Sequence, residues 1–204
     1  MEQTRKALIV GMAKSGIGAA KLLSREGWHV TVNDKKPEIP DLAEALEGAA
    51  VEYRLGEDPT TLFDGMELIV ISPIIPMTAP FVLEAKRRGI EVISEIELGY
   101  RYSNAEFVCI TGTNGKTTCT ALTGEMFKNG GRHTFVLGNI GVAITEHARD
   151  TKEGDVVVAE TAGLQLEGNV HFHARAAGVC NITEDHRDHF GTMENYIAAK
   201  CKNF

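Results

Sequence analysis

The sequence has no long apolar run, no excess of basic residues and few cysteines. No uninterrupted apolar run approaches the roughly 20 residues that a membrane-spanning helix needs. The N-terminus leads directly into a short strand-like run and lacks the apolar core of a secretory signal. A formal net charge of −7 argues against nucleic acid and anionic membranes as partners. We therefore expect a soluble globular protein with neither nucleic-acid nor membrane partners.

The four cysteines, Cys109, Cys119, Cys180 and Cys201, do not have the spacing of a metal site. Cys109 and Cys180 fall in apolar, strand-like runs. Thiols in a reducing compartment are the simplest explanation for this pattern. We therefore expect a cytoplasmic protein.

The most informative motif is a glycine-rich segment that follows an apolar strand-like run and opens a helix. Two glycines let several backbone N–H groups face one anion, Lys116 neutralises the outer phosphates, and Thr117 offers a hydroxyl to Mg²⁺. Ile110 stands where the standard P-loop has its first glycine, so the motif is a shortened variant. We predict that ATP is held by Gly112, Thr113, Asn114, Gly115, Lys116, Thr117 and Thr118.

A second glycine-rich segment, Gly11-Met-Ala-Lys-Ser-Gly16-Ile-Gly18, follows the first strand-like run. It resembles the dinucleotide-binding fingerprint, except that Ala13 replaces the glycine that admits a pyrophosphate. Asp34 ends the next strand, where such folds place an acid against a ribose hydroxyl. A nicotinamide cofactor, another nucleotide-like ligand and simple turn geometry all remain open, and we favour the nucleotide-like ligand. The loop 72–80 follows a further strand and should lie at the same sheet edge.

Short apolar runs alternate with amphipathic segments along the whole chain. We expect strands at 6–10, 30–33, 68–71, 91–93, 107–111, 133–137, 156–159 and 176–181. We expect helices at 15–25, 41–46, 80–88, from 116 onward and at 192–202. This alternation predicts parallel sheets with helices on both faces. The polar segment 102–106 divides the chain into a Rossmann-like α/β domain at 1–103 and a P-loop-type α/β ATP-binding domain at 104–204.

Further polar residues of the second unit follow apolar strands. Glu160 ends the run 156–159, where a carboxylate can serve Mg²⁺ or its water; a solvated strand end is the alternative. His186 lies among Glu184, Asp185 and Asp188, which favours a role in a site over a structural role.

The helices of the second unit raise two questions of burial. Lys200 shares a helix face with an apolar stripe. Either the side chain is buried, in which case it is paired or chemically modified, or its stem packs on the apolar face while the ammonium group reaches water. Met126 and Phe127, in the helix after the ATP loop, are expected in the core.

Together these motifs resemble the Mur ligases of bacterial cell-wall synthesis. Gly138-Asn-Ile-Gly141, Gln165-Leu-Glu167 and Ala198-Ala-Lys200 also follow the order and spacing of that family. The ATP loop alone would admit the wider superfamily, including folylpolyglutamate synthetases. The loop at 11–16 and the segment 95–99 favour the member that joins D-glutamate to UDP-N-acetylmuramoyl-L-alanine.

The resemblance implies an ATP-dependent amide ligase that works through an acyl phosphate and requires Mg²⁺. It implies catalytic roles for Lys116, Glu160, His186 and Lys200. Two Mg²⁺ sites would use Thr117, Glu160, His186 and a carbamate formed on Lys200. The substrate would contact Lys14, Ser15, Gly16, Asp34, Lys35, Lys36, Ser72, Asn139, Gln165 and His186.

Three segments depart from the family pattern. Ile74 replaces a glycine beside the expected uracil pocket, Ala162-Gly163-Leu164 replaces Ser-Ser-Phe, and His189-Phe190 replaces Arg-His. The resemblance also predicts that the ATP-binding domain is incomplete at Phe204 and that a C-terminal domain is absent. We therefore expect the 204-residue chain alone not to complete the reaction. The alternatives are a non-catalytic fragment that binds UDP-sugar and ATP, and another ligase of the Mur or folylpolyglutamate type. No feature of the sequence sets the oligomeric state.

Overall fold

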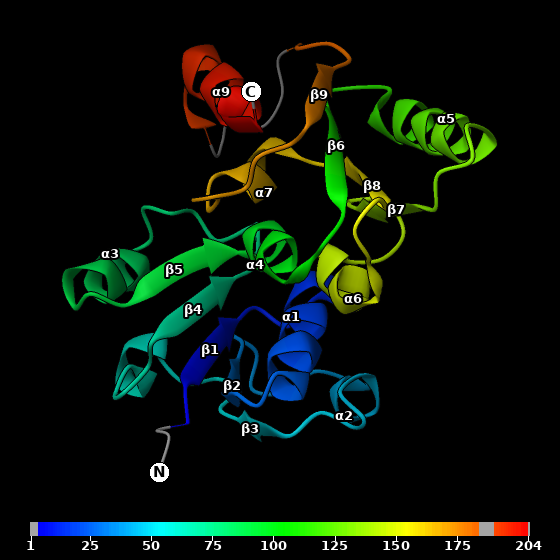
Figure 1. Cartoon of the computed structure of the whole chain (residues 1–204). Helices are drawn as coiled ribbons and strands as arrows, with labels where there is room; N and C mark the ends of the chain where they lie inside the picture. Colours follow the sequence, from blue (N-terminus) through cyan, green and yellow to red (C-terminus); the bar gives the residue numbers. More distant parts are fainter. Residues whose placement is uncertain (1–3, 184–189, 204) are drawn as a thin grey trace.

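The computed structural model describes residues 4–183 and 190–203, in which two parallel sheets follow one another along the chain (Figure 1). The first sheet has the strand order β3-β2-β1-β4-β5. Its strands are β1 (Lys6–Val10), β2 (His29–Asn33), β3 (Val51–Tyr53), β4 (Leu68–Ile71) and β5 (Glu91–Ser94). All neighbouring strands pair in parallel, which confirms the α/β fold class expected from the sequence.

The order in which strands are added to the first sheet reverses between β1 and β4. The chain runs from β1 outward to β2 and β3, and then returns to place β4 and β5 on the other side of β1. Ligands bind in such sheets at the carboxyl ends of the two strands that flank this change. The glycine loop follows β1 and Ser72 follows β4, and the Ser72 N–H donates to the Val10 carbonyl at 2.8 Å. The two loops therefore lie side by side at this edge.

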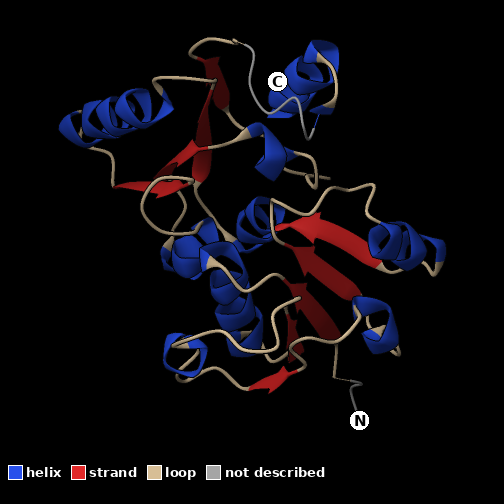
Figure 2. Ribbon diagram, turned by 180° about the vertical axis from the view of Figure 1, so that it is seen from behind, coloured by secondary structure: helices blue, strands red, loops and turns tan. Residues whose placement is uncertain are grey.

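Helices cover both faces of the first sheet (Figure 2). The helical elements of this part are α1 (Lys14–Arg25), α2 (Leu42–Ala45), η1 (Pro59–Leu62), α3 (Pro80–Arg87) and α4 (Glu95–Tyr102). Ala19 and Leu23 of α1 pack with Ile9 on one face, whereas Val82 of α3 packs with Leu8 on the other. Both faces are apolar because alternate side chains of the buried strands point in opposite directions.

Gly16 allows α1 to begin directly against the loop that precedes it. A Cβ atom at this position would lie 2.0 Å from the carbonyl oxygen of Gly11. We expect Gly16→Ala to destabilise the chain by about 3 kcal/mol or more, because the clash is with backbone that cannot move aside. Urea unfolding measures the change. Gly178→Ala is the matched control, since its Cβ would meet only the end of the Ile110 side chain at 3.4 Å; equal losses in both variants would contradict the account.

The second sheet has the order β7-β8-β6-β9. Its strands are β6 (Glu106–Thr111), β7 (Thr134–Gly138), β8 (Val156–Glu160) and β9 (Ala176–Val179). The helical elements around it are α5 (Lys116–Asn129), α6 (Ile144–His147), η2 (Ala148–Asp150), α7 (Gly163–Leu166), α9 (Met193–Lys200) and η3 (Cys201–Asn203). Tyr100, Phe107 and Phe172 pack edge to face in the core of this part, with ring centroids 5.3–5.5 Å apart.

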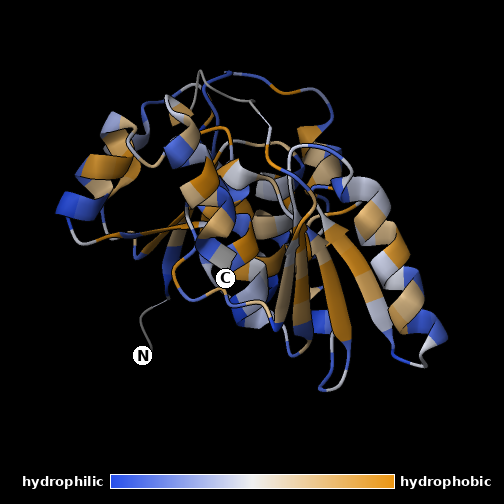
Figure 3. Cartoon of the chain, turned by 90° about the horizontal axis from the view of Figure 1, so that it is seen from above, coloured by the Kyte–Doolittle hydropathy of each residue, from blue (hydrophilic) through white to orange (hydrophobic). Residues whose placement is uncertain are grey.

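The hydropathy view shows apolar residues concentrated along the strands (Figure 3). Helix α5 is an exception to the expected burial. Leu122 and Met126 are 61% and 66% exposed, and Phe127 is half-buried. The expectation that Met126 lies in the core was wrong, because the face of α5 that carries it has no covering element in the described part of the chain.

None of the described helices combines the length and the apolar character that crossing a bilayer demands.

Polar contacts join the two sheets through α6. The N–H and hydroxyl of Thr145 donate to Glu95 Oε1 at 2.7 and 2.8 Å. Just after α6, the Arg149 guanidinium of η2 pairs with the carboxylate of Glu26, the C-cap residue of α1. On the other side of α4, Ser94 Oγ donates to Asn169 Oδ1 at 2.6 Å. Contacts on both sides of α4 therefore fix the carboxyl edge of the first sheet relative to the second.

Candidate functional site

The ATP loop connects the end of β6 to the start of α5. Gly112 has a φ of +145°, and a Cβ atom there would lie 3.0 Å from Cys180 Cβ and 3.2 Å from the Asn181 nitrogen. The position therefore requires glycine for both its backbone conformation and its surroundings. The N-cap of α5 is Gly115, which has no capping side chain. The first N–H groups of the helix are consequently available to an anion.

The segment that follows β9 holds the ATP loop in place. The Thr113 N–H donates to the Asn181 carbonyl at 2.9 Å. The Asn181 side chain accepts from the Asn114 N–H and donates to the Asn114 carbonyl, both at 2.9 Å. The sequence indicated a polar segment from Asn181 to Asp188 at the carboxyl end of a strand, but it did not predict that Asn181 bonds to the ATP loop. The loop is thus organised before any ligand binds.

The basic and hydroxyl groups of the loop lie at its helical end. Lys116 Nζ donates to the Thr113 carbonyl at 2.8 Å, so the lysine folds back over its own loop. Thr117 and Thr118 are exposed on the first turn of α5. The arrangement presents one cation, two hydroxyls and a helix N-terminus to the same volume, which suits a polyphosphate.

Glu160 places a carboxylate next to this loop. Strand β8 pairs with β6 so that Glu160 lies opposite Ile110. Its Oε1 accepts from Asn139 Nδ2 at 2.8 Å, while Oε2 is buried and has no hydrogen-bond partner among the described residues. A buried carboxylate oxygen of this kind calls for a partner such as a cation.

The residues present fit Mg²⁺, which prefers oxygen ligands and keeps waters and substrate phosphates in its coordination shell. Thr117 and Glu160 would be the residues that hold it. Within residues 4–183 and 190–203, histidine, cysteine and carboxylate side chains do not gather in a group of three or more that could hold a metal. His186, the further predicted ligand, lies outside the described residues.

Lys200 lies in the interior, 2% exposed, and does not extend to water. Its Nζ donates to the Gly112 carbonyl at 2.8 Å and lies 4.6 Å from the centre of the Tyr196 ring. The side chain therefore connects α9 to the ATP loop. Both an ammonium group and the N–H of a carbamate can donate this bond, so the contact is compatible with either form of the lysine.

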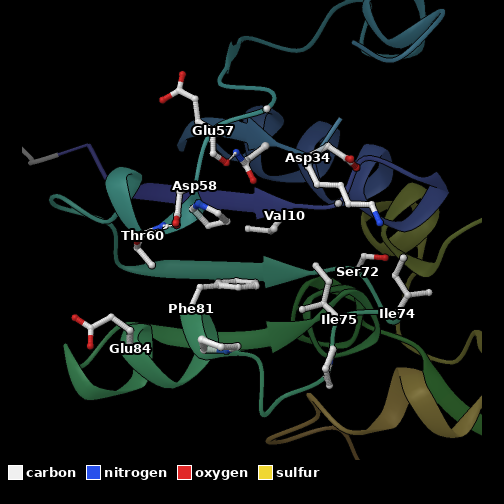
Figure 4. Close-up of a pocket in the computed structure, with 17 residues that line it drawn as sticks. Val10, Asp34, Glu57, Asp58, Thr60, Ser72, Ile74, Ile75, Phe81 and Glu84 are labelled. Carbon is white, nitrogen blue, oxygen red and sulfur yellow. Dashed lines mark hydrogen bonds between the residues drawn. The ribbon is translucent and has the colours of Figure 1, made fainter. Parts of the chain in front are cut away.

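A cavity of about 850 Å³, here called the sheet-edge cavity, opens at the carboxyl edge of the first sheet (Figure 4). Three predicted substrate residues line it: Asp34, Lys35 and Ser72. Asp34 accepts from the Met12 N–H at 2.8 Å and from the Lys36 N–H at 3.0 Å. The carboxylate therefore fixes the glycine loop to the end of β2 while it borders the cavity. Lys36 is exposed and is not among the residues that line this cavity.

A second cavity of about 340 Å³, the junction cavity, lies where the two sheets meet. It brings together Lys14 and Ser15 of the first glycine loop with Asn139 and Gln165 of the second unit. Gln165 Oε1 accepts from the Ala162 N–H at 2.9 Å, which orients the amide. Gly16 is buried in α1 and is not among the lining residues. Seven of the ten predicted substrate residues thus line one or both of these two neighbouring cavities.

Glu95 is a wall residue of the junction cavity that sequence reasoning missed. It is 3% exposed. Burial raises the pKa of its carboxyl group above the ordinary value, although the hydrogen bonds from Thr145 act in the opposite direction. The segment 95–99 marked the family resemblance but gave no sign that its first carboxylate faces a cavity.

The residues that depart from the family pattern lie around the same volume. Ala162 and Leu164 line the junction cavity. A Cβ atom at Gly163 would lie 3.3 Å from the Phe190 ring and 3.6 Å from Lys200 Cγ. Because residue 163 has no side chain, the Phe190 ring and the Lys200 side chain have room to lie beside it.

Two protein-family models match most of the chain. The model "Mur ligase MurD-like, N-terminal domain" matches residues 5–94, and the model "Mur ligase middle domain" matches residues 110–204. The UDP-N-acetylmuramoylalanine–D-glutamate ligase of Alkaliphilus metalliredigens is 44% identical over 99% of this chain and 45% of its own length. The enzyme of the same name from Halalkalibacterium halodurans is 46% identical over 96% and 44%, respectively. The chain therefore spans a little less than half the length of these relatives.

Solved structures agree on the fold. A crystal structure of UDP-N-acetylmuramate:L-alanyl-gamma-D-glutamyl-meso-diaminopimelate ligase from Neisseria meningitides matches 98% of this chain and 68% of its own, with a TM-score of 0.64 and 18% identity. A murein peptide ligase from Psychrobacter arcticus matches 98% of this chain and 47% of its own, with a TM-score of 0.59 and 17% identity.

Proposed function

Because the chain belongs to the Mur ligase family, as a MurD-like N-terminal domain followed by a middle domain, we propose that it serves the ATP-dependent joining of D-glutamate to UDP-N-acetylmuramoyl-L-alanine. The sequence matches to ligases of that name support this choice within the family. We assign the UDP-sugar domain to residues 1–103 and the ATP-binding domain to residues 104–204. We also propose that the protein acts in the cytoplasm.

The proposal is supported mainly by two adjoining cavities that lead from the first sheet toward the ATP loop. The sheet-edge cavity and the junction cavity share Ser72 and Ile74. The junction cavity then reaches Asn139, whose amide donates to Glu160 beside the ATP loop. A nucleotide-linked substrate in the first cavity would therefore extend its acyl end toward the phosphates of ATP.

The proposed reaction needs alignment and charge neutralisation. Phosphoryl transfer from ATP to a carboxylate places negative charge on the transferred group, and a fixed cation stabilises that charge. Lys116 and the N-terminus of α5 supply such groups. Mg²⁺, held by Thr117 and Glu160, would neutralise further phosphate charge. Asn139 and Gln165 would orient the acyl end of the substrate, and Lys200 would fix the ATP loop through the Gly112 carbonyl.

We expect Glu160→Gln to reduce the gain in ATP affinity that Mg²⁺ provides by about 10-fold, because the amide lacks the charge that favours the cation. The measurement compares ATP binding with Mg²⁺ and with EDTA, in the original chain and in the variant. Glu153→Gln, an exposed carboxylate before β8, is the control and should leave the gain unchanged. Equal gains in all three proteins would remove Glu160 from the proposed metal site.

A ligand panel separates the proposed function from the other ligases of the superfamily. We expect UDP-N-acetylmuramoyl-L-alanine at 100 times its Kd to stabilise the chain by about 2.7 kcal/mol. That gain corresponds to a rise in Tm of roughly 5–10 °C. UDP-N-acetylmuramic acid should give a smaller rise at the same concentration, and folate none. A larger rise with either of those two compounds would assign the chain to a different ligase.

A further inference from the structure

Ile74 is the most exposed of the large apolar residues that the structure describes, at 73%. Its neighbour Ile75 instead packs against the apolar core beneath the loop. The exposure of Ile74 is therefore specific to one side chain and not a property of the whole loop. Burial of a large exposed apolar side chain by a ligand would contribute favourable free energy to binding.

The loop that carries Ile74 is held in one conformation. Pro73 and Pro76 flank the two isoleucines. The Ile75 N–H donates to the Ser72 carbonyl and the Ala79 N–H to the Pro76 carbonyl, both at 2.9 Å. Prolines and turn hydrogen bonds reduce the conformational freedom that the loop would lose when a ligand binds. The Ile74 side chain is consequently presented at a fixed place.

That place is the passage between the two cavities. Ser72 and Ile74 are the residues that the linings of the sheet-edge cavity and the junction cavity have in common. Ser72 is 5% exposed, so Ile74 provides most of the accessible side-chain surface at the crossing. Figure 4 shows Ser72, Ile74 and Ile75 together at one end of the sheet-edge cavity, away from Thr60 and Glu84.

We propose that Ile74 is a specificity-determining contact, which packs against the part of a ligand that passes from the sheet-edge cavity into the junction cavity. It favours nucleotide sugars that span both cavities over nucleotides that fill only the first. This inference rests on the proposed function, because it takes UDP-N-acetylmuramoyl-L-alanine as the spanning ligand.

The test compares two ligands of different length. We measure the Kd of UDP-N-acetylmuramoyl-L-alanine and of UMP by calorimetry for the original chain, for Ile74→Ala and for Ile74→Leu. The alanine variant should bind the nucleotide sugar about 10-fold more weakly but UMP within about 2-fold of the original chain, because the longer ligand covers the lost side chain from both cavities, whereas UMP reaches it only from the sheet-edge cavity. Leucine should restore most of the affinity. Leu83→Ala, which removes an exposed side chain of α3, is the control and should change neither Kd.

The possible results separate this inference from the proposed function. If the original chain binds the nucleotide sugar and Ile74→Ala binds it equally well or more tightly, the role of Ile74 is overturned and the proposed function stands. Equal losses for both ligands also overturn the role as a spanning contact. If the original chain does not bind the nucleotide sugar, the proposed function itself fails.

Discussion

Replacing Lys116 with methionine should weaken Mg²⁺-ATP binding by about 100-fold, or about 2.8 kcal/mol. The substitution removes the cation of the ATP loop while it keeps a side chain of similar length. Lys116 Nζ donates to the Thr113 carbonyl at 2.8 Å, so the ammonium group already lies at the loop that we propose as the phosphate site. Calorimetric titration of the purified chain with Mg²⁺-ATP measures the loss.

Lys128→Met is the matched control for this experiment. Lys128 is an exposed lysine at the other end of α5 and pairs with Glu125. Its loss should leave ATP affinity unchanged. If Lys116→Met bound ATP as tightly as the original chain, the segment 112–118 could not be the phosphate site.

Replacing Glu97 with glutamine should destabilise the chain by about 3 kcal/mol. The Glu97 side chain is 0% exposed and accepts from the N–H groups of Val170, His171 and Phe172 at 2.8–3.0 Å. Its carboxylate also pairs with Arg101 at 2.7 Å. A glutamine amide has only one acceptor oxygen, so backbone donors and the guanidinium would lose their partner.

Glu97 should also make stability depend on pH. Burial raises the pKa of its carboxyl group, but the hydrogen bonds from the three N–H groups and Arg101 outweigh burial and hold the pKa below the ordinary value. The unfolded chain therefore binds a proton at higher pH than the folded chain does. This contribution is present above the unfolded pKa of about 4.3 and is lost as the pH falls through the folded pKa. Urea unfolding at several pH values should show a shallower acid loss in Glu97→Gln.

Glu67→Gln is the control for both effects. Glu67 pairs with Arg5 at the surface, where the side chains are 50% and 60% exposed, respectively. Its substitution should change stability by less than about 1 kcal/mol. Equal losses for the two variants, or an unchanged pH profile in Glu97→Gln, would show that the buried carboxylate does not anchor the segment 170–172.

The regular elements with strong apolar patterns were predictable from the sequence. Strands β1, β4 and β8 and helices α1 and α3 lie within a residue or two of their expected bounds. Strand β3 was missed because it has three residues and is largely exposed at the edge of the sheet. Helices α6 and α7 have four residues each, which is too short for a helical period.

Helix α4 was missed for a different reason. Ser94 and Glu97 stand in the spacing of a capping box, and Ser94 Oγ does accept from the Glu97 N–H at 3.1 Å. The pattern was obscured because Glu95 and Glu97 are buried in this helix. Carboxylates on a buried face contradict the apolar periodicity by which a helix is recognised. Apart from Arg101, which lies one helical turn from Glu97, their partners lie 50 to 75 residues away in the sequence and could not be inferred from local spacing.

The candidate site, like the fold, could be predicted only in part from the sequence. The ends of β1, β4, β6 and β8 meet at sheet edges because parallel strands must, so the glycine loops, Ser72 and Glu160 could be placed from the sequence. The contacts of Asn181 with the ATP loop depend on the pairing of β9 with β6 inside the second unit. The exposure of Ile74 and the position of Glu95 depend on how the two units pack. The roles of the individual site residues, and those of the residues outside the described ranges, stay predictions.

The most direct test of the proposed function is a calorimetric titration of the 204-residue chain with UDP-N-acetylmuramoyl-L-alanine. We predict saturable binding of one ligand per chain, because both the sheet-edge cavity and the junction cavity are formed by the residues of this chain. The absence of binding at millimolar ligand would contradict the assignment of these cavities to a nucleotide-linked muramoyl substrate.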